Sequence, residues 1–116
     1  MKDDIAFIEH ILLCIDKIQE YTKDITDEDF NNSELIQDAV IRNIEIIGEA
    51  TKKISKDIKS QYHEVPWKEM SGMRDKLIHD NFGVDVDVVW KTVNEDIPFL
   101  KSLIENIDKL ATDANK

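Results

Sequence analysis

The chain has 116 residues and a formal net charge of −10, with 41% apolar and 34% charged residues. This composition is too apolar for a disordered chain, and no apolar run approaches the ~20 residues that cross a bilayer. A single cysteine, Cys14, excludes an internal disulfide framework. The acidic start, MKDDIAFIEH, lacks the pattern of a signal peptide, so we expect one cytoplasmic domain over residues 1–116 and no membrane association.

The first half of the chain predicts two long helices. Apolar residues recur at the helical spacing of three and four from about Asp3 to Asp24, and Asp3 and Asp4 lie in the first turn, where the helix dipole favours acids. The polar stretch TDEDFNNSE then predicts a loop. A second helix, capped by Asn32 or Ser33, is predicted to continue to about Ser60, with Gly48 marking close helix packing.

The second half predicts a shorter helix and another long one. The short helix starts at Pro66 and carries apolar residues as far as Ile78. The long one starts at Asp85 or Asp87, and Pro98 predicts a kink near residues 94–97 because proline has no backbone N–H to donate. No segment predicts a strand. We therefore expect an all-α fold, an antiparallel four-helix bundle with a shorter third helix.

Most of the side chains that could carry chemistry have a simpler structural interpretation. Cys14 lies beside the apolar stripe of the first helix, which predicts a buried free thiol. His10 and His63 have no partner at metal-ligand spacing, so we expect no metal site, and the absence of nucleotide-binding motifs predicts no cofactor. Asn43 interrupts an apolar face, which favours a structural or interface role over a catalytic one.

Arg74 and His79 form the sharpest candidate pair, in the stretch GMRDKLIHDNFG. Five residues turn a helix by about 140° from the starting face, so the two side chains meet only if the helix ends near His79 or if two chains converge in a dimer. Histidine transfers protons near neutral pH and arginine binds phosphate, which suits phosphodiester cleavage, with Asp75 able to orient either group. Spacing alone, however, favours a histidine at a helix end and a surface arginine.

Charge gives a mixed indication about nucleic acid. The chain as a whole is acidic, and an acidic chain binds polyanions poorly. Residues 51–76, which lead into the Arg74 stretch, carry seven Lys/Arg against four Asp/Glu. A polyanion could still bind at this local basic region, although composition alone argues mildly against nucleic acid.

Three stretches together resemble the HepT-like branch of the HEPN ribonuclease toxins. They are RNIEIIGEA at 42–50, VPWKEMSGMRDKLIH at 65–79 and FGVDVDVVWKTVNEDIPFL at 82–100, in the expected order. The resemblance implies a single HEPN-like helical domain that forms a homodimer. It also implies a metal-independent endoribonuclease toxin, in which the RNA 2′-hydroxyl attacks the adjacent phosphate at a composite site in the dimer cleft.

The family's Arg-x4-His motif falls on Arg74 and His79 of this chain. By that resemblance Arg74 binds the scissile phosphate and His79 transfers protons, while Asp75 stands where asparagine is usual. The implied partners are an RNA substrate and a nucleotidyltransferase antitoxin, which can join the dimer in a larger hetero-oligomer. The antitoxin of such systems adenylylates a tyrosine two residues after the histidine. Here that position is Asn81, an amide with no hydroxyl to receive AMP, so we expect no modification there.

Two other readings compete with a toxin. The net charge, Asp75 and the missing tyrosine also fit a non-catalytic helical partner subunit of a nucleotidyltransferase. A plain dimeric helical bundle predicts no close approach of Arg74 and His79.

Overall fold

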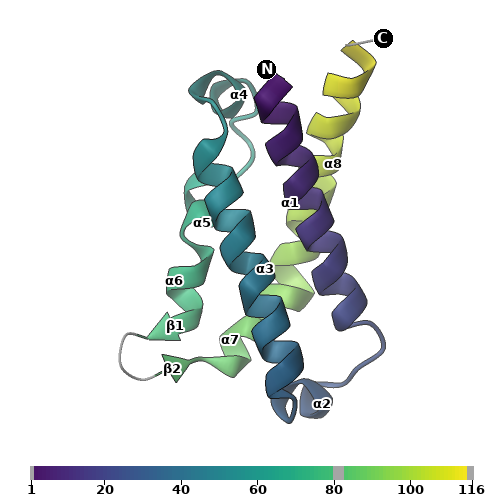
Figure 1. The fold of residues 1–116 in the computed structure, drawn as a ribbon, viewed down its shortest axis with the longest axis vertical. Coiled ribbons are helices and arrows are strands. Elements are labelled where there is room, and N and C mark those ends of the chain that lie inside the picture. The colour runs from purple at the N-terminus through teal and green to yellow at the C-terminus, as the bar shows by residue number, and fades with distance from the viewer. Residues whose placement is uncertain (1, 80–82, 115–116) are drawn as a thin grey trace.

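The chain folds into long antiparallel helices joined by short ones, as seen in a computed structural model that describes residues 2–79 and 83–114 (Figure 1). The predicted all-α class is confirmed, although one very short strand pair is present. In chain order, the elements are α1 (Lys2–Tyr21), α2 (Asp27–Asn31), α3 (Glu34–Lys53), α4 (Lys56–Gln61), α5 (Trp67–Ser71), α6 (Met73–Leu77), β1 (Ile78–His79), β2 (Gly83–Val84), α7 (Val86–Lys91), the π-helix η2 (Thr92–Asp96) and α8 (Ile97–Ala114).

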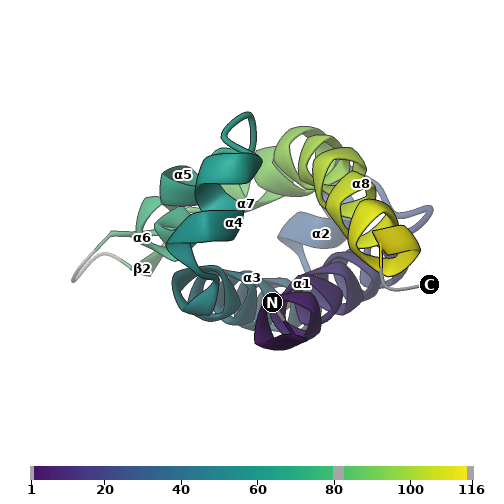
Figure 2. The ribbon, with the colours of Figure 1, turned by 90° about the horizontal axis from the view of Figure 1, so that it is seen from above.

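The long helices α1, α3 and α8 form the frame of the fold. α1 packs against α3 on one side and α8 on the other, while α5 and α6 pack against α3 (Figures 1 and 2). The amphipathic stripes meet between these helices, where isoleucine provides most of the fully buried side chains, namely Ile11, Ile15, Ile18, Ile44, Ile47, Ile97 and Ile104. Leu35 and Leu110 are apolar but exposed. None of the described helices is long and apolar enough to cross a membrane.

The predicted second helix is shorter than expected and ends at Lys53. Ile54 adopts an extended backbone, with φ −72° and ψ 139°, and α4 then starts afresh. The Ser55 hydroxyl caps α4 by accepting a hydrogen bond from the Ile58 N–H. The Asp4 carboxylate, on α1, accepts hydrogen bonds from both the N–H and the hydroxyl of Ser55. The break is thus fixed by a residue far away in the sequence.

The predicted loop between the first two long helices contains the short helix α2. Thr26 and Asp29 form a capping box, in which each side chain accepts a hydrogen bond from the backbone N–H of the other residue. Phe30 is fully buried, and its ring lies 4.9 Å from that of Trp90. This aromatic contact anchors an otherwise polar segment.

The distortion predicted before Pro98 is present and takes the form of η2, a π-helical turn. Asp85 caps α7 by accepting a hydrogen bond from the Val88 N–H, as expected for one of the two predicted start positions. α7, η2 and α8 then follow one another without a break. Pro98 has no N–H to donate, and a π-turn beside it rearranges the hydrogen bonds that a regular helix would need there.

Candidate active site

The segment that carries Arg74 is two short helices rather than one. α5 ends at Ser71, and Gly72 separates it from α6. α6 ends at Leu77, since Ile78 is extended with φ −118° and ψ 120°. Of the two arrangements that would allow Arg74 and His79 to meet, a helix that ends before the histidine is therefore present.

A small antiparallel ladder follows this helix end, although we predicted no strand. Ile78 pairs with Val84 and His79 with Gly83. The Leu77 carbonyl accepts a hydrogen bond of 2.8 Å from the Asp85 N–H, which ties α6 to the start of α7. Gly83 has φ +80°, a conformation that favours glycine. This ladder replaces the helical hydrogen bonds that Ile78 and His79 would otherwise make.

Gly48 lets α3 pass very close to the end of α5, as the sequence predicted. A Cβ atom at this position would lie 3.3 Å from the Ser71 carbonyl oxygen and 3.5 Å from that of Met70. A methyl group at this position would therefore make an unusually tight contact, and a side chain larger than alanine would push the two helices apart. The close approach brings the start of α6, and with it Arg74, beside the middle of α3.

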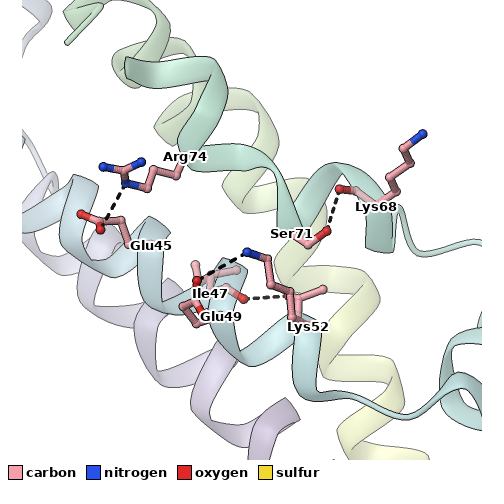
Figure 3. A network of polar contacts seen from close by, with 8 residues as sticks. Glu45, Ile47, Glu49, Lys52, Lys68, Ser71 and Arg74 are labelled. Carbon is pink, nitrogen blue, oxygen red and sulfur yellow. Dashed lines mark hydrogen bonds and ion pairs between the residues drawn. The ribbon is translucent and has the colours of Figure 1, made fainter. Parts of the chain in front are cut away.

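Arg74 forms an ion pair with Glu45 of α3 (Figure 3). The Nε atom of Arg74 lies 3.2 Å from Oε2 of Glu45, and the arginine side chain remains 50% exposed. In Figure 3 the contact with Glu45 starts at the Nε atom of Arg74, and no contact joins Glu45 to the two terminal nitrogens. No other hydrogen bond or ion pair to Arg74 is formed by the side chains that the structure describes.

A polar groove of about 290 Å³ surrounds this ion pair, and it also contains Asp75. Its lining comes from α3 and from the α5–α6 segment: Glu45, Gly48, Glu49, Lys52, Ser71, Arg74 and Asp75. The Nζ atom of Lys52 lies 3.5 Å from the Oε1 atom of Glu49, so a second cation is paired in the same groove. The groove thus brings together two of the predicted site residues, Arg74 and Asp75.

The structure describes less of the other two positions of the predicted motif, His79 and Asn81. The backbone puts His79 in β1, two residues after the end of α6, and its pairing with Arg74 stays a prediction. Asn81 lies outside the described residues, so the expectation that it is unmodified also stays a prediction.

Two of the other polar or reactive side chains, Asn43 and Cys14, agree with their structural interpretations. Asn43 is buried and donates a hydrogen bond to the Ala39 carbonyl of its own helix. Cys14 is buried, and burial raises the pKa of its thiol more than the nearby charge of Lys17 lowers it. Within the described residues, no group of three or more His, Cys, Asp or Glu side chains could hold a metal ion.

Glu45 is the residue of the groove that sequence reasoning missed. Its spacing of four residues from Glu49 indicates only an exposed polar stripe on the helix. The available signal was Gly48, which lies between the two glutamates and predicted that another segment would pack there.

Comparison with known proteins assigns the chain to a family. The family described as "Ribonuclease HepT-like" matches residues 11–107. The chain is 53% identical over 103 residues to a Thermococcus cleftensis protein named "Probable ribonuclease HepT", covering 89% of this chain and 94% of that protein. The chain therefore belongs to the HepT-like ribonuclease family, and this membership supports a nuclease.

Two relatives from Methanocaldococcus jannaschii carry related names. One, named as a candidate RNase, is 50% identical over 108 residues, with 93% of each chain covered. The other, named as a gamma-glutamylcyclotransferase and candidate RNase, is 48% identical over 112 residues. That match covers 93% of this chain but only 50% of the relative, so this chain spans about half of that protein's length. No solved structure matches the chain.

Proposed function

We propose that this chain is a metal-independent endoribonuclease toxin that cleaves RNA at a site formed by two copies of the chain. The observation that carries the proposal is the position of Arg74, which lies in a polar groove and contacts Glu45 through its Nε atom, within the family's Arg-x4-His motif. The names of the relatives, all of which include a ribonuclease, support the same reaction class.

In the proposed reaction Arg74 binds the non-bridging oxygens of the scissile phosphate and stabilises the charge that develops on them. The RNA 2′-hydroxyl loses its proton and its oxygen attacks the adjacent phosphorus. A bond from O2′ to phosphorus forms, the bond from phosphorus to O5′ breaks, and the leaving O5′ takes a proton. His79 transfers these protons, and the products are a 2′,3′-cyclic phosphate and a free 5′-hydroxyl.

The proposed partner is a nucleotidyltransferase antitoxin. Asn81 has no hydroxyl to receive a nucleotide, so we propose that this partner does not silence the toxin through residue 81. Mass spectrometry of the chain after incubation with such an enzyme and ATP tests this point. The variant Asn81→Tyr should gain AMP at the new tyrosine, whereas AMP on Asn81 itself would contradict the proposal.

RNA cleavage in the presence of a chelator tests the activity. We expect His79→Ala to lower the rate by roughly 10²–10⁴ and Arg74→Ala by roughly 10²–10³. Both variants should keep the helical circular dichroism spectrum of the unaltered chain. Equal cleavage by all three proteins would show that the activity comes from elsewhere, and no cleavage by any of them would reject the enzyme.

A mixing experiment tests whether the site is shared between copies. The chain carrying both substitutions is added in excess to the unaltered chain, and the two are allowed to exchange. If two copies build one site, activity per unaltered chain falls as mixed dimers form. Constant activity per unaltered chain would show that each copy works alone.

One observation favours the second function, a non-catalytic partner subunit of a nucleotidyltransferase. The groove contains three carboxylates, from Glu45, Glu49 and Asp75, against two cations, and such a balance opposes a phosphate chain. This function predicts a stable complex with the transferase and no RNA turnover. Cleavage that His79→Ala abolishes would reject it.

A further inference from the structure

The Arg74–Glu45 ion pair is too weak to be explained by its contribution to folding. The side chains of Arg74 and Glu45 are 50% and 32% exposed, respectively. Ion pairs at such exposed positions contribute little to stability, because water and salt screen them and two long side chains must be ordered. A role for this contact must therefore be sought in the groove that it borders.

The atoms of the contact suggest that role. An arginine can bind a phosphate through its two terminal nitrogens, or side-on through Nε and one terminal nitrogen. Here the Nε atom of Arg74 forms the ion pair, at 3.2 Å from the Oε2 atom of Glu45, and Figure 3 shows no contact between Glu45 and the two terminal nitrogens. The side-on mode is thus occupied by the protein itself, and the end-on mode remains open.

We propose that Glu45 is a positioning residue, which holds the Arg74 guanidinium by its Nε–H so that both terminal nitrogens face a substrate phosphate. The inference rests on the proposed function, in which Arg74 binds the scissile phosphate. Glu45 itself does not touch the substrate.

The scaffold around Glu45 suits this role. Glu45 belongs to the long helix α3, whose neighbouring residues Ile44 and Ile47 are fully buried against the core. The close approach at Gly48 sets how near α6 comes to α3. The carboxylate is therefore held by a rigid element, whereas Arg74 sits on a helix of only five residues and has a long side chain. Fixing such a side chain in advance removes part of the entropy that substrate binding would otherwise cost.

Two substitutions at Glu45 distinguish a role in orienting the Arg74 guanidinium from a role of the negative charge alone. Glu45→Gln keeps an oxygen that can accept from the Arg74 Nε–H but removes the negative charge. Glu45→Ala removes both. If Glu45 acts by orientation, the alanine variant should lose about tenfold in kcat/KM, and the glutamine variant should stay close to the unaltered chain.

Asp38 provides the matched control. It is an exposed acid on the same helix, two turns before Glu45, and it does not line the groove. Asp38→Ala removes the same charge as Glu45→Ala and should leave the cleavage rate unchanged. All the variants should melt within a few degrees of the unaltered chain, because exposed ion pairs contribute so little to folding.

The experiment measures RNA cleavage by these variants and by Glu45→Ala in the Arg74→Ala background. In that background Glu45 has no guanidinium to position, so the second substitution should cause no further loss. A merely structural role would instead lower activity in both backgrounds.

Three results would overturn the inference: cleavage by Glu45→Ala as fast as by the unaltered chain, a lower KM for RNA in both Glu45 variants, or an equal loss of activity in both. The second result would make Glu45 a competitor of the phosphate, and the third would show that its charge matters rather than its orientation. These failures differ from failure of the proposed function, which would appear as no cleavage by the unaltered chain or no effect of Arg74→Ala, and would overturn both.

Discussion

Asp4 ties the start of α1 to the junction between α3 and α4, and its removal should destabilise the fold measurably. The side chain is buried, and its two oxygens accept hydrogen bonds of 2.8 Å from the N–H and the hydroxyl of Ser55. These bonds close a span of 51 residues. The perturbation we consider is Asp4→Ala, with Asp3→Ala as its matched control, because Asp3 is the neighbouring acid in the same helical turn and is exposed.

The expected magnitude follows from the number and kind of the lost bonds. A hydrogen bond to a charged group contributes about 1.5–3 kcal/mol net, but Ser55 is only partly buried, so water can replace some of what is lost. We expect Asp4→Ala to cost about 2–3 kcal/mol of unfolding free energy, which lowers the melting temperature of a chain of this size by roughly 10 °C. Asp3→Ala loses only an interaction with the helix dipole, about 0.3–1 kcal/mol.

The effect of Asp4 should also depend on pH. Burial raises the pKa of this carboxyl, but the hydrogen bonds from the Ser55 N–H and hydroxyl lower it by a larger amount. The pKa therefore lies below its ordinary value. Since the folded pKa is the lower one, ionised Asp4 adds stability that is complete above the ordinary value of about 3.9 and is lost as pH falls through the folded pKa.

Urea unfolding of the unaltered chain, Asp4→Ala, Asp4→Asn and Asp3→Ala between pH 7 and pH 3 measures both effects. The stability gap between the unaltered chain and Asp4→Asn should be constant near neutral pH and shrink below about pH 4. Equal losses in the Asp4 and Asp3 variants, or a gap that stays constant down to pH 3, would refute this account of the junction.

Two further predictions concern buried positions. Gly48→Val should destabilise the fold by about 1–3 kcal/mol and slow RNA cleavage, because its side chain would meet the Ser71 carbonyl, whereas Gly48→Ala gains about 1 kcal/mol of helix propensity that offsets its smaller clash. Equal stability of the two variants in thermal melts would contradict this. Cys14 should resist a thiol reagent at pH 8 and react in urea, because it is buried and its pKa is raised, and rapid labelling of the native chain would contradict its placement.

The long helices could be predicted from the sequence because their apolar residues repeat with the helical period. Ile11, Ile15 and Ile18 fall on one face of α1 and all are fully buried. The break after Lys53 could not be predicted in the same way, because it depends on a hydrogen bond from the Ser55 N–H to Asp4, which belongs to another helix. α2 was missed for a different reason: its capping residues were visible in the sequence, but its short length and polar composition favoured a loop.

The candidate site was only partly predictable, because the Arg-x4-His spacing has no fixed meaning on a helix. A continuous helix would leave Arg74 and His79 on faces about 140° apart. That separation does not apply here, because the chain leaves the helix at Ile78 and pairs with Gly83–Val84 instead. The pairing depends on Gly83, which has a positive φ, and on the Asp85 N–H that donates to the last carbonyl of α6. Periodicity within residues 65–79 contains neither of these features. The Glu45 contact was hidden for a similar reason, since it joins residues 29 positions apart through the close approach at Gly48. The structural features that make Arg74 a candidate catalytic residue thus depend on segments outside the Arg-x4-His motif.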